Sequence, residues 1–144
     1  MTAAESLTIT AESGHLAEVR AFVRDALARF GASPAIAADL VQAVDEAVCN
    51  IIVHGYGSDR GEIEIGAQLR DRQIEITLLD RSFTFDPTTE PAPDLSVPPL
   101  ARTPGGMGIH LVRAGTDEVH HRARAGGGNE LRLVRSLEPR AEED

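Results

Sequence analysis

Residues 34–56 read PAIAADLVQAVDEAVCNIIVHGY, and the pattern of this stretch decides the fold. Apolar residues recur every three or four positions, a spacing typical of an amphipathic helix that packs on a core. Ser33 can cap the first N–H groups of such a helix, and Pro34 suits its first position. We expect a helix over 34–54 that ends at Gly55-Tyr56-Gly57. Its apolar face consists of Ile36, Leu40, Val44, Ala47, Val48 and Ile51.

The segments on either side of this helix predict the rest of the architecture. A second amphipathic helix is expected over 13–30, with Gly31 as its C-terminal cap. Alternating apolar residues predict strands, and a two-residue turn at Asp71-Arg72 joins two of them as a hairpin. A third helix is expected around 109–112. The expected strands cover residues 7–10, 63–69, 74–80, 117–124 and 130–135. We therefore predict an α+β fold, a two-layer sandwich with the helices on one face of a mixed, mostly antiparallel sheet.

Composition limits the class of protein. The chain has 144 residues with 14 Lys+Arg and 23 Asp+Glu, a net charge of −9. That length predicts one domain, over 1–137, followed by an acidic tail over 138–144. The negative charge argues against direct binding to nucleic acid and to anionic lipid. No apolar stretch reaches the roughly 18 residues that span a bilayer, and no signal peptide is recognisable, so we expect a cytoplasmic protein.

Three polar clusters could carry chemistry, and the first lies on the helix quoted above. Glu46, Asn50 and His54 are four residues apart and form one stripe. A carboxylate and an amide one turn apart can hold a hard cation or orient a hydroxyl. The alternative is an ordinary solvated helix face. Cys49, the single cysteine, is expected to be a small core residue.

The second and third clusters follow the second hairpin strand. Asp80 ends that strand and begins a polar segment, which is either a ligand site or a turn signal. The next stretch, 83–104, holds six of the eight prolines and has no sustained periodicity. Gly105, Gly106 and Gly108 then open a helix, where backbone N–H groups can cradle a phosphate, or the glycines form a flexible hinge. Their spacing fits neither a P-loop nor a dinucleotide fingerprint.

The order of these clusters resembles the anti-sigma-factor serine/threonine kinases of the GHKL superfamily, whose nucleotide site is called the Bergerat fold. Residues 46–56 resemble the family's N box, 80–87 its first glycine box, and 105–112 its second. The resemblance covers roughly residues 8–135. It implies a histidine-kinase-like ATPase domain with an ATP lid over about 84–104.

The resemblance also implies roles for individual residues. Glu46 would be the catalytic base toward a partner's Ser or Thr hydroxyl, and Asn50 would bind Mg²⁺ and the ATP phosphates. Asp80 would bind the adenine amino group, with Ser82 and Phe85 beside it. The glycines Gly105, Gly106 and Gly108 would form the phosphate-facing hinge of the lid.

The implied partners are a sigma factor and a STAS-type anti-sigma antagonist, and a homodimer is expected. One departure is Ser82, because the family pattern places glycine there. If that position needs a positive φ or a close approach to adenine, serine costs about 1 kcal/mol or more. The sequence therefore leaves a second function open, a partner-sequestering regulator with weak or absent nucleotide binding and phosphotransfer.

Overall fold

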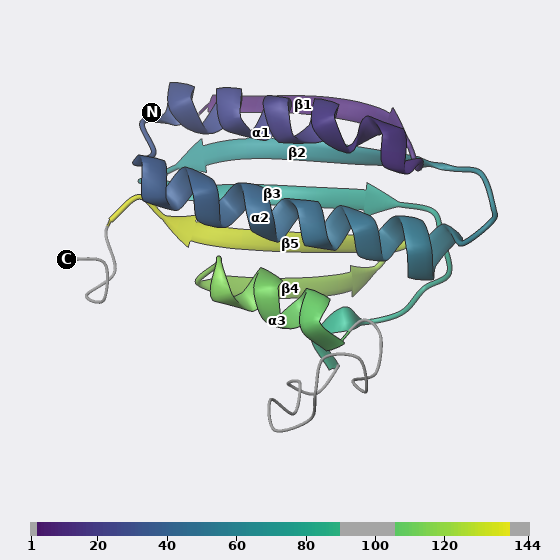
Figure 1. The fold of residues 1–144 in the computed structure, drawn as a ribbon. Coiled ribbons are helices and arrows are strands. Elements are labelled where there is room, and N and C mark those ends of the chain that lie inside the picture. Colours follow the sequence, from purple (N-terminus) through teal and green to yellow (C-terminus); the bar gives the residue numbers. More distant parts are fainter. Residues whose placement is uncertain (1–2, 90–105, 139–144) are drawn as a thin grey trace.

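The computed structural model describes residues 3–89 and 106–138. Within these residues the strands form one sheet in the order β1-β2-β3-β5-β4, and each neighbouring pair is antiparallel. Three α-helices lie on one side of the sheet (Figure 1). The predicted two-layer α+β architecture is therefore confirmed. The strands are β1 (Ala3–Thr10), β2 (Glu62–Arg70), β3 (Gln73–Asp80), β4 (Glu118–Ala123) and β5 (Asn129–Ser136).

The two long helices form where the periodicity predicted them. α1 (Leu16–Phe30), preceded by the short 3-10 turn η1 (Ser13–His15), ends at Gly31, whose φ of 85° is the left-handed cap conformation. α2 (Pro34–Asn50) begins after Ser33, whose side chain accepts a hydrogen bond from the Ile36 N–H. α3 (Gly106–Ala114) packs against α2 and β4.

The core between the helices and the sheet is mostly aliphatic. On the inner sheet face, Ile63 and Ile65 of β2 and Ile76 and Leu78 of β3 are fully buried. The apolar residues of α1 and α2 cover them, and burial of such side chains is the main stabilising term. Tyr56 and Phe30 are the aromatic residues buried within the described part of the chain.

The end of the helix predicted over 34–54 differs from the prediction. After Asn50 the chain widens into a π-helix, η2 (Ile51–Tyr56), in which the Gly57 N–H bonds the Ile52 carbonyl five residues back. The buried Tyr56 donates a hydrogen bond to the Glu62 carbonyl and accepts one from the Arg81 N–H. The wider turn thus joins the end of the helix to β2 and to the segment after β3.

Strand register brings the functional candidates together at one end of the sheet. Asp80, the last residue of β3, lies opposite Asn129, the first residue of β5. The 3-10 turn η3 (Pro87–Thr89) follows β3 and contacts β4. Among the residues that the structure describes, no helix is long and apolar enough to cross a membrane.

Candidate functional site

A pocket opens at this end of the sheet, between α2, α3 and the ends of β3, β4 and β5. Its polar lining consists of Asn50, Asp80, His121 and Asn129. Its other walls are mostly apolar and include Phe85. A largely apolar pocket with a few convergent polar groups is typical of a small-molecule site.

Asp80 is the most constrained of the polar groups. Its side chain is 1% exposed. Oδ1 accepts hydrogen bonds from the Ser82 N–H at 2.9 Å, the Ser82 hydroxyl at 2.6 Å and the Asn129 amide at 3.1 Å. Oδ2 is buried and has no hydrogen-bond partner among the described residues. A buried carboxylate oxygen without a partner is costly, so Oδ2 is suited to accept a hydrogen bond from a ligand.

Asn129 links Asp80 to the segment that follows β3. Its amide nitrogen also donates to the Phe83 carbonyl at 3.0 Å. Its Oδ1 accepts from the Phe85 N–H at 3.1 Å and from His121 Nε2 at 2.7 Å. Because the amide oxygen can only accept, Nε2 of His121 carries the proton in this contact.

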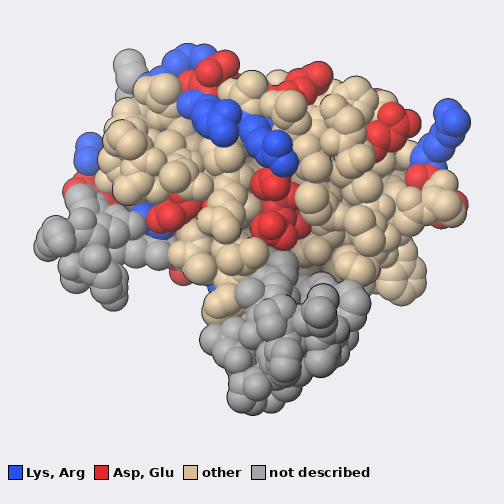
Figure 2. Space-filling model, viewed as in Figure 1, with Lys and Arg blue, Asp and Glu red and all other residues tan. Residues whose placement is uncertain are grey.

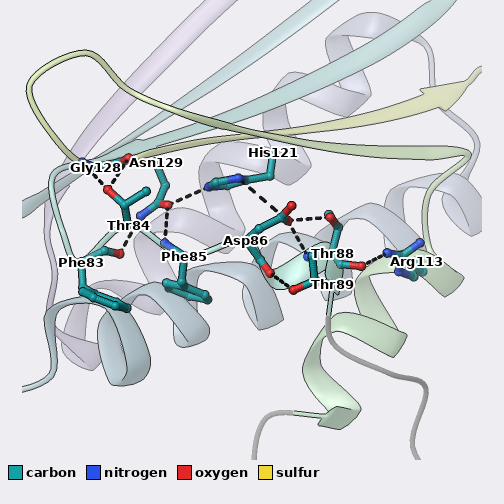
Figure 3. A network of polar contacts seen from close by, with 10 residues as sticks. All are labelled: Phe83, Thr84, Phe85, Asp86, Thr88, Thr89, Arg113, His121, Gly128 and Asn129. Carbon is teal, nitrogen blue, oxygen red and sulfur yellow. Dashed lines mark hydrogen bonds and ion pairs between the residues drawn. The ribbon is translucent and has the colours of Figure 1, made fainter.

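The segment 83–89, where the predicted lid begins, is fastened to the β4–β5 hairpin and to α3 (Figure 3). The Thr84 hydroxyl accepts from the Gly128 N–H, and Arg113 of α3 donates to the Thr88 carbonyl. Asp86 accepts from the backbone and the hydroxyl of Thr88 and lies 3.9 Å from Nδ1 of His121. The beginning of the predicted lid is therefore an ordered wall of the pocket; residues 90–104 of that lid lie outside the described residues.

The charge of Asp86 is stabilised by this arrangement. Burial opposes its ionisation, but the hydrogen bonds from Thr88 and the nearby His121 and Arg113 outweigh burial. The pKa of Asp86 consequently lies below its usual value.

Gly128 allows the hairpin to reach the end of β3. Its φ is +105°, and a Cβ at this position would lie 2.1 Å from the Asp80 carbonyl oxygen. Arg124 donates to that same carbonyl at 2.9 Å. Only glycine combines this backbone conformation with so close an approach.

Ser82 does not have the backbone conformation that the sequence raised as a possible cost. Among the described residues, the non-glycine positions with positive φ are Asp71 and Arg72 of the β2–β3 turn. Ser82 is buried, and its hydroxyl bonds Asp80 as described above. The Ser82 side chain fits because the facing residue, Gly55, has no side chain. A Cβ at Gly55 would lie 2.4 Å from the Ser82 oxygen.

Asn50 and Glu46 lie one turn apart on α2 but face different spaces. Asn50 lines the pocket with Asp80, whereas Glu46 lines a surface groove between α1 and α2. In that groove Arg20 bonds Asp45 at 2.7 Å. Figure 2 shows basic and acidic side chains side by side on this helix-covered face. Glu46 is thus beside the pocket but not part of its lining.

The charges of this groove also act on Cys49. Burial is the main cause of its raised pKa, and the carboxylates of Asp45 and Glu46 add to the shift. Cys49 is therefore a thiol with little thiolate character at neutral pH.

Most of the site residues that the sequence predicted lie in or next to the pocket. Asp80, Phe85 and Asn50 line one pocket, and Ser82 bonds Oδ1 of Asp80 without lining the pocket itself. Gly106 and Gly108 lie in the first turn of α3, and Gly105 is outside the described residues.

The sequence did not single out Asn129 or His121 as site residues. Their contribution depends on strand pairing, since β4 and β5 align them with the end of β3. His120 and His121 are adjacent on β4 and point to opposite sheet faces, and their side chains are 47% and 8% exposed.

Residues 9–135 match the histidine kinase-like ATPase domain. The chain belongs to this family. The resemblance seen in the sequence, and the histidine-kinase-like ATPase fold that it implied, are confirmed.

Two relatives of the chain carry names that refer to regulation and to kinase activity. The chain is 30% identical over 120 residues to the anti-sigma F factor of Caldanaerobacter subterraneus subsp. tengcongensis, covering 81% of this chain and 84% of the relative. It is 28% identical over 117 residues to the serine-protein kinase RsbW of Bacillus cereus, covering 78% of this chain and 73% of the relative.

A solved structure supports the fold. The RsbU and RsbW domains of a Mycobacterium tuberculosis protein superpose with a TM-score of 0.67 at 25% identity. The match covers 93% of this chain and 32% of that one. This chain therefore corresponds to about a third of the larger protein.

Proposed function

We propose that this chain is an ATP-dependent protein serine/threonine kinase that acts as an anti-sigma regulatory factor. The observation that carries the proposal is the unpartnered Oδ2 of Asp80, buried in the pocket of a histidine kinase-like ATPase domain. An adenine amino group can supply the missing hydrogen bond. The names of the anti-sigma F factor and RsbW relatives support the regulatory and kinase parts.

The pocket residues suit the parts of ATP. Phe85 offers an aromatic surface to the base beside Asp80. The first turn of α3, with Gly106 and Gly108, offers backbone N–H groups to the phosphates, and Gly105 would precede it. Residues 84–104 would act as a lid whose first part, 84–89, is already fixed to the hairpin.

Asn50 is the proposed Mg²⁺ ligand. Its amide lines the pocket and can offer an oxygen, the ligand atom that Mg²⁺ prefers. Bound with ATP, Mg²⁺ supplies positive charge to the phosphates, which phosphoryl transfer needs more than covalent help.

Glu46 is the proposed base toward the hydroxyl of the protein substrate. One turn before Asn50, it lies on the helix-covered face, outside the pocket. A partner's serine or threonine can therefore approach from the α1–α2 side while the nucleotide occupies the pocket. The carboxylate would accept the hydroxyl proton as the oxygen attacks phosphorus.

The proposed partners are a sigma factor and a STAS-type anti-sigma antagonist, with the protein acting in the cytoplasm as a homodimer. The domain would comprise residues 1–137, and 138–144 would be a tail. The net charge of −9 argues that regulation is exerted through proteins and not through direct contact with DNA.

Two experiments test the proposal. Millimolar ATP with Mg²⁺ should raise the unfolding temperature of the wild type; no shift would overturn nucleotide binding. With labelled ATP and antagonist proteins encoded nearby, label should appear on the antagonist, and Glu46→Ala should abolish transfer while retaining the ATP-dependent shift. The control is Glu75→Gln, which removes a carboxylate of β3 that lies outside this groove and should retain transfer. Binding without transfer to any antagonist would instead support the partner-sequestering function.

A further inference from the structure

The two oxygens of Asp80 have opposite surroundings. Oδ1 receives three hydrogen bonds, two from Ser82 and one from Asn129, at 2.6 to 3.1 Å. Oδ2, equally buried, receives none from the described residues. All donors therefore converge on one side of the carboxylate, and the other side is left as a bare acceptor.

Ser82 supplies the shortest of the three bonds through its hydroxyl. The hydroxyl is enclosed, because Ser82 is 8% exposed and Gly55 lies directly across from it. A turn of the hydroxyl away from Asp80 would leave a buried polar group without its charged acceptor. The local packing thus holds the Ser82 oxygen against Oδ1.

Asn129 is held just as firmly in the matching orientation. Its Oδ1 accepts from Phe85 and His121, so its amide N–H groups face Asp80 and the Phe83 carbonyl. Rotation of the Ser82 hydroxyl or of the Asn129 amide would therefore break a hydrogen bond to Asp80 without forming another. The carboxylate is fixed with Oδ2 as its remaining acceptor.

We infer that Ser82 is a positioning residue that makes the pocket selective for a purine with a 6-amino group over a 6-oxo purine. This inference rests on the proposed ATP-binding function. A 6-amino group donates to Oδ2, whereas a 6-oxo group would place a second acceptor against it. Sites that present a fixed hydrogen-bonding group discriminate strongly, because the wrong ligand leaves buried polar groups unpaired.

The proposed role of Ser82 differs from a contribution to overall stability, because it affects recognition of one ligand group, the substituent at C6 of the purine. Without the Ser82 hydroxyl, Oδ1 keeps two donors, and the carboxylate can turn to share its oxygens between Ser82 N–H and Asn129. Affinity for a 6-amino purine should then fall, while affinity for a 6-oxo purine should change little. Loss of the fold alone would weaken both ligands together.

The test compares ATP with inosine triphosphate, which carries oxygen in place of the amino group at C6. Dissociation constants are measured by calorimetry with Mg²⁺ for the wild type, Ser82→Ala and Ser82→Gly. We expect the wild type to bind ATP more tightly than inosine triphosphate. In each variant the ratio of the two affinities should fall about tenfold, the size expected for one hydrogen bond to a charged group. Ser82→Gly adds no atom to the pocket and serves as the second variant if Ser82→Ala folds poorly.

The matched control is Thr84→Ala, which removes a hydroxyl two residues away that bonds the backbone of Gly128 and not Asp80. It should keep the wild-type ratio of ATP to inosine triphosphate affinity, even if both affinities fall. An unchanged ratio in the two Ser82 variants, with ATP still bound, would overturn the role of Ser82 and leave the proposed function standing. A wild type that binds neither nucleotide would overturn both.

Discussion

Replacing Gly55 with alanine tests whether Ser82 and Gly55 form one packing unit. The added Cβ would lie 2.4 Å from the Ser82 Oγ and 3.0 Å from the Ser82 Cβ. Both separations are far inside van der Waals contact. The oxygen can escape only by leaving Asp80, 2.6 Å away, and the Cβ can move only with the backbone.

The magnitude follows from these two contacts. Overpacking of a buried site costs about 1–3 kcal/mol, and a lost hydrogen bond to a charged group costs a similar amount. Alanine regains up to roughly 1 kcal/mol over glycine in a helical segment, and Gly55 has no positive φ to oppose it. We expect Gly55→Ala to lower the free energy of unfolding by about 3 kcal/mol.

The decisive variant is Gly55→Ala with Ser82→Gly. Ser82→Gly removes both atoms that the new Cβ would meet, so the double variant should be about 4 kcal/mol more stable than the sum of the single changes. With Ser82→Ala as second change, rescue should be partial, because the Ser82 Cβ remains.

Urea unfolding measures these differences, provided that the slope with denaturant stays constant. Gly14→Ala is the control, since a Cβ at Gly14 meets nothing within 4 Å. Gly55→Ala as stable as Gly14→Ala, or strictly additive changes in the double variant, would refute the reasoning.

Three further predictions concern Asp86, Cys49 and Gly128. The pKa of Asp86 is lowered in the folded chain, so its ionised form contributes stability above the usual value of 3.8. The difference in unfolding free energy between wild type and Asp86→Asn should be steady above pH 5 and shrink as the pH falls through that lowered pKa. Because the pKa of Cys49 is raised, iodoacetamide should modify it more slowly than free cysteine at pH 7.5, and Glu46→Gln should speed the reaction; modification faster than free cysteine would contradict this. Gly128→Ala should lower the free energy of unfolding by about 3 kcal/mol or more and weaken ATP binding. Gly127→Ala should lower it by about 1 kcal/mol, because Gly127 has the same φ of +105° but open space around it. Equal losses in urea unfolding would show that the contact with Asp80 is unimportant.

The separation of Glu46 from the pocket bears on how the proposed reaction is organised. Asn50 of α2 lines the pocket together with Asp80 of β3, whereas Glu46 of α2 lines the α1–α2 groove. Under the proposed function, the hydroxyl of the protein substrate would reach the phosphate at the edge of the pocket, beside Glu46 and one turn before Asn50. Removing Glu46 should consequently impair transfer without impairing nucleotide binding.

Local pattern was sufficient for the elements of the fold. The 3.6-residue periodicity of α1 and α2, the cap at Ser33 and the Asp71-Arg72 turn depend on residues close together in the chain. The same local signals placed Asn50 on a helix and Asp80 at a strand end. Each of these features depends on interactions within a few residues, which a sequence displays directly.

The sequence by itself therefore determined that the helices and the hairpin form, and it displayed the family's motifs. Only the tertiary structure decided that β5 lies between β3 and β4, which places Asn129 on Asp80. Only the tertiary structure decided that Ser82 is accommodated, because the space for its hydroxyl is made by Gly55, 27 positions earlier in the chain and held there by the π-helical turn. Contacts between distant residues are set by packing of whole elements, and no local spacing encodes them.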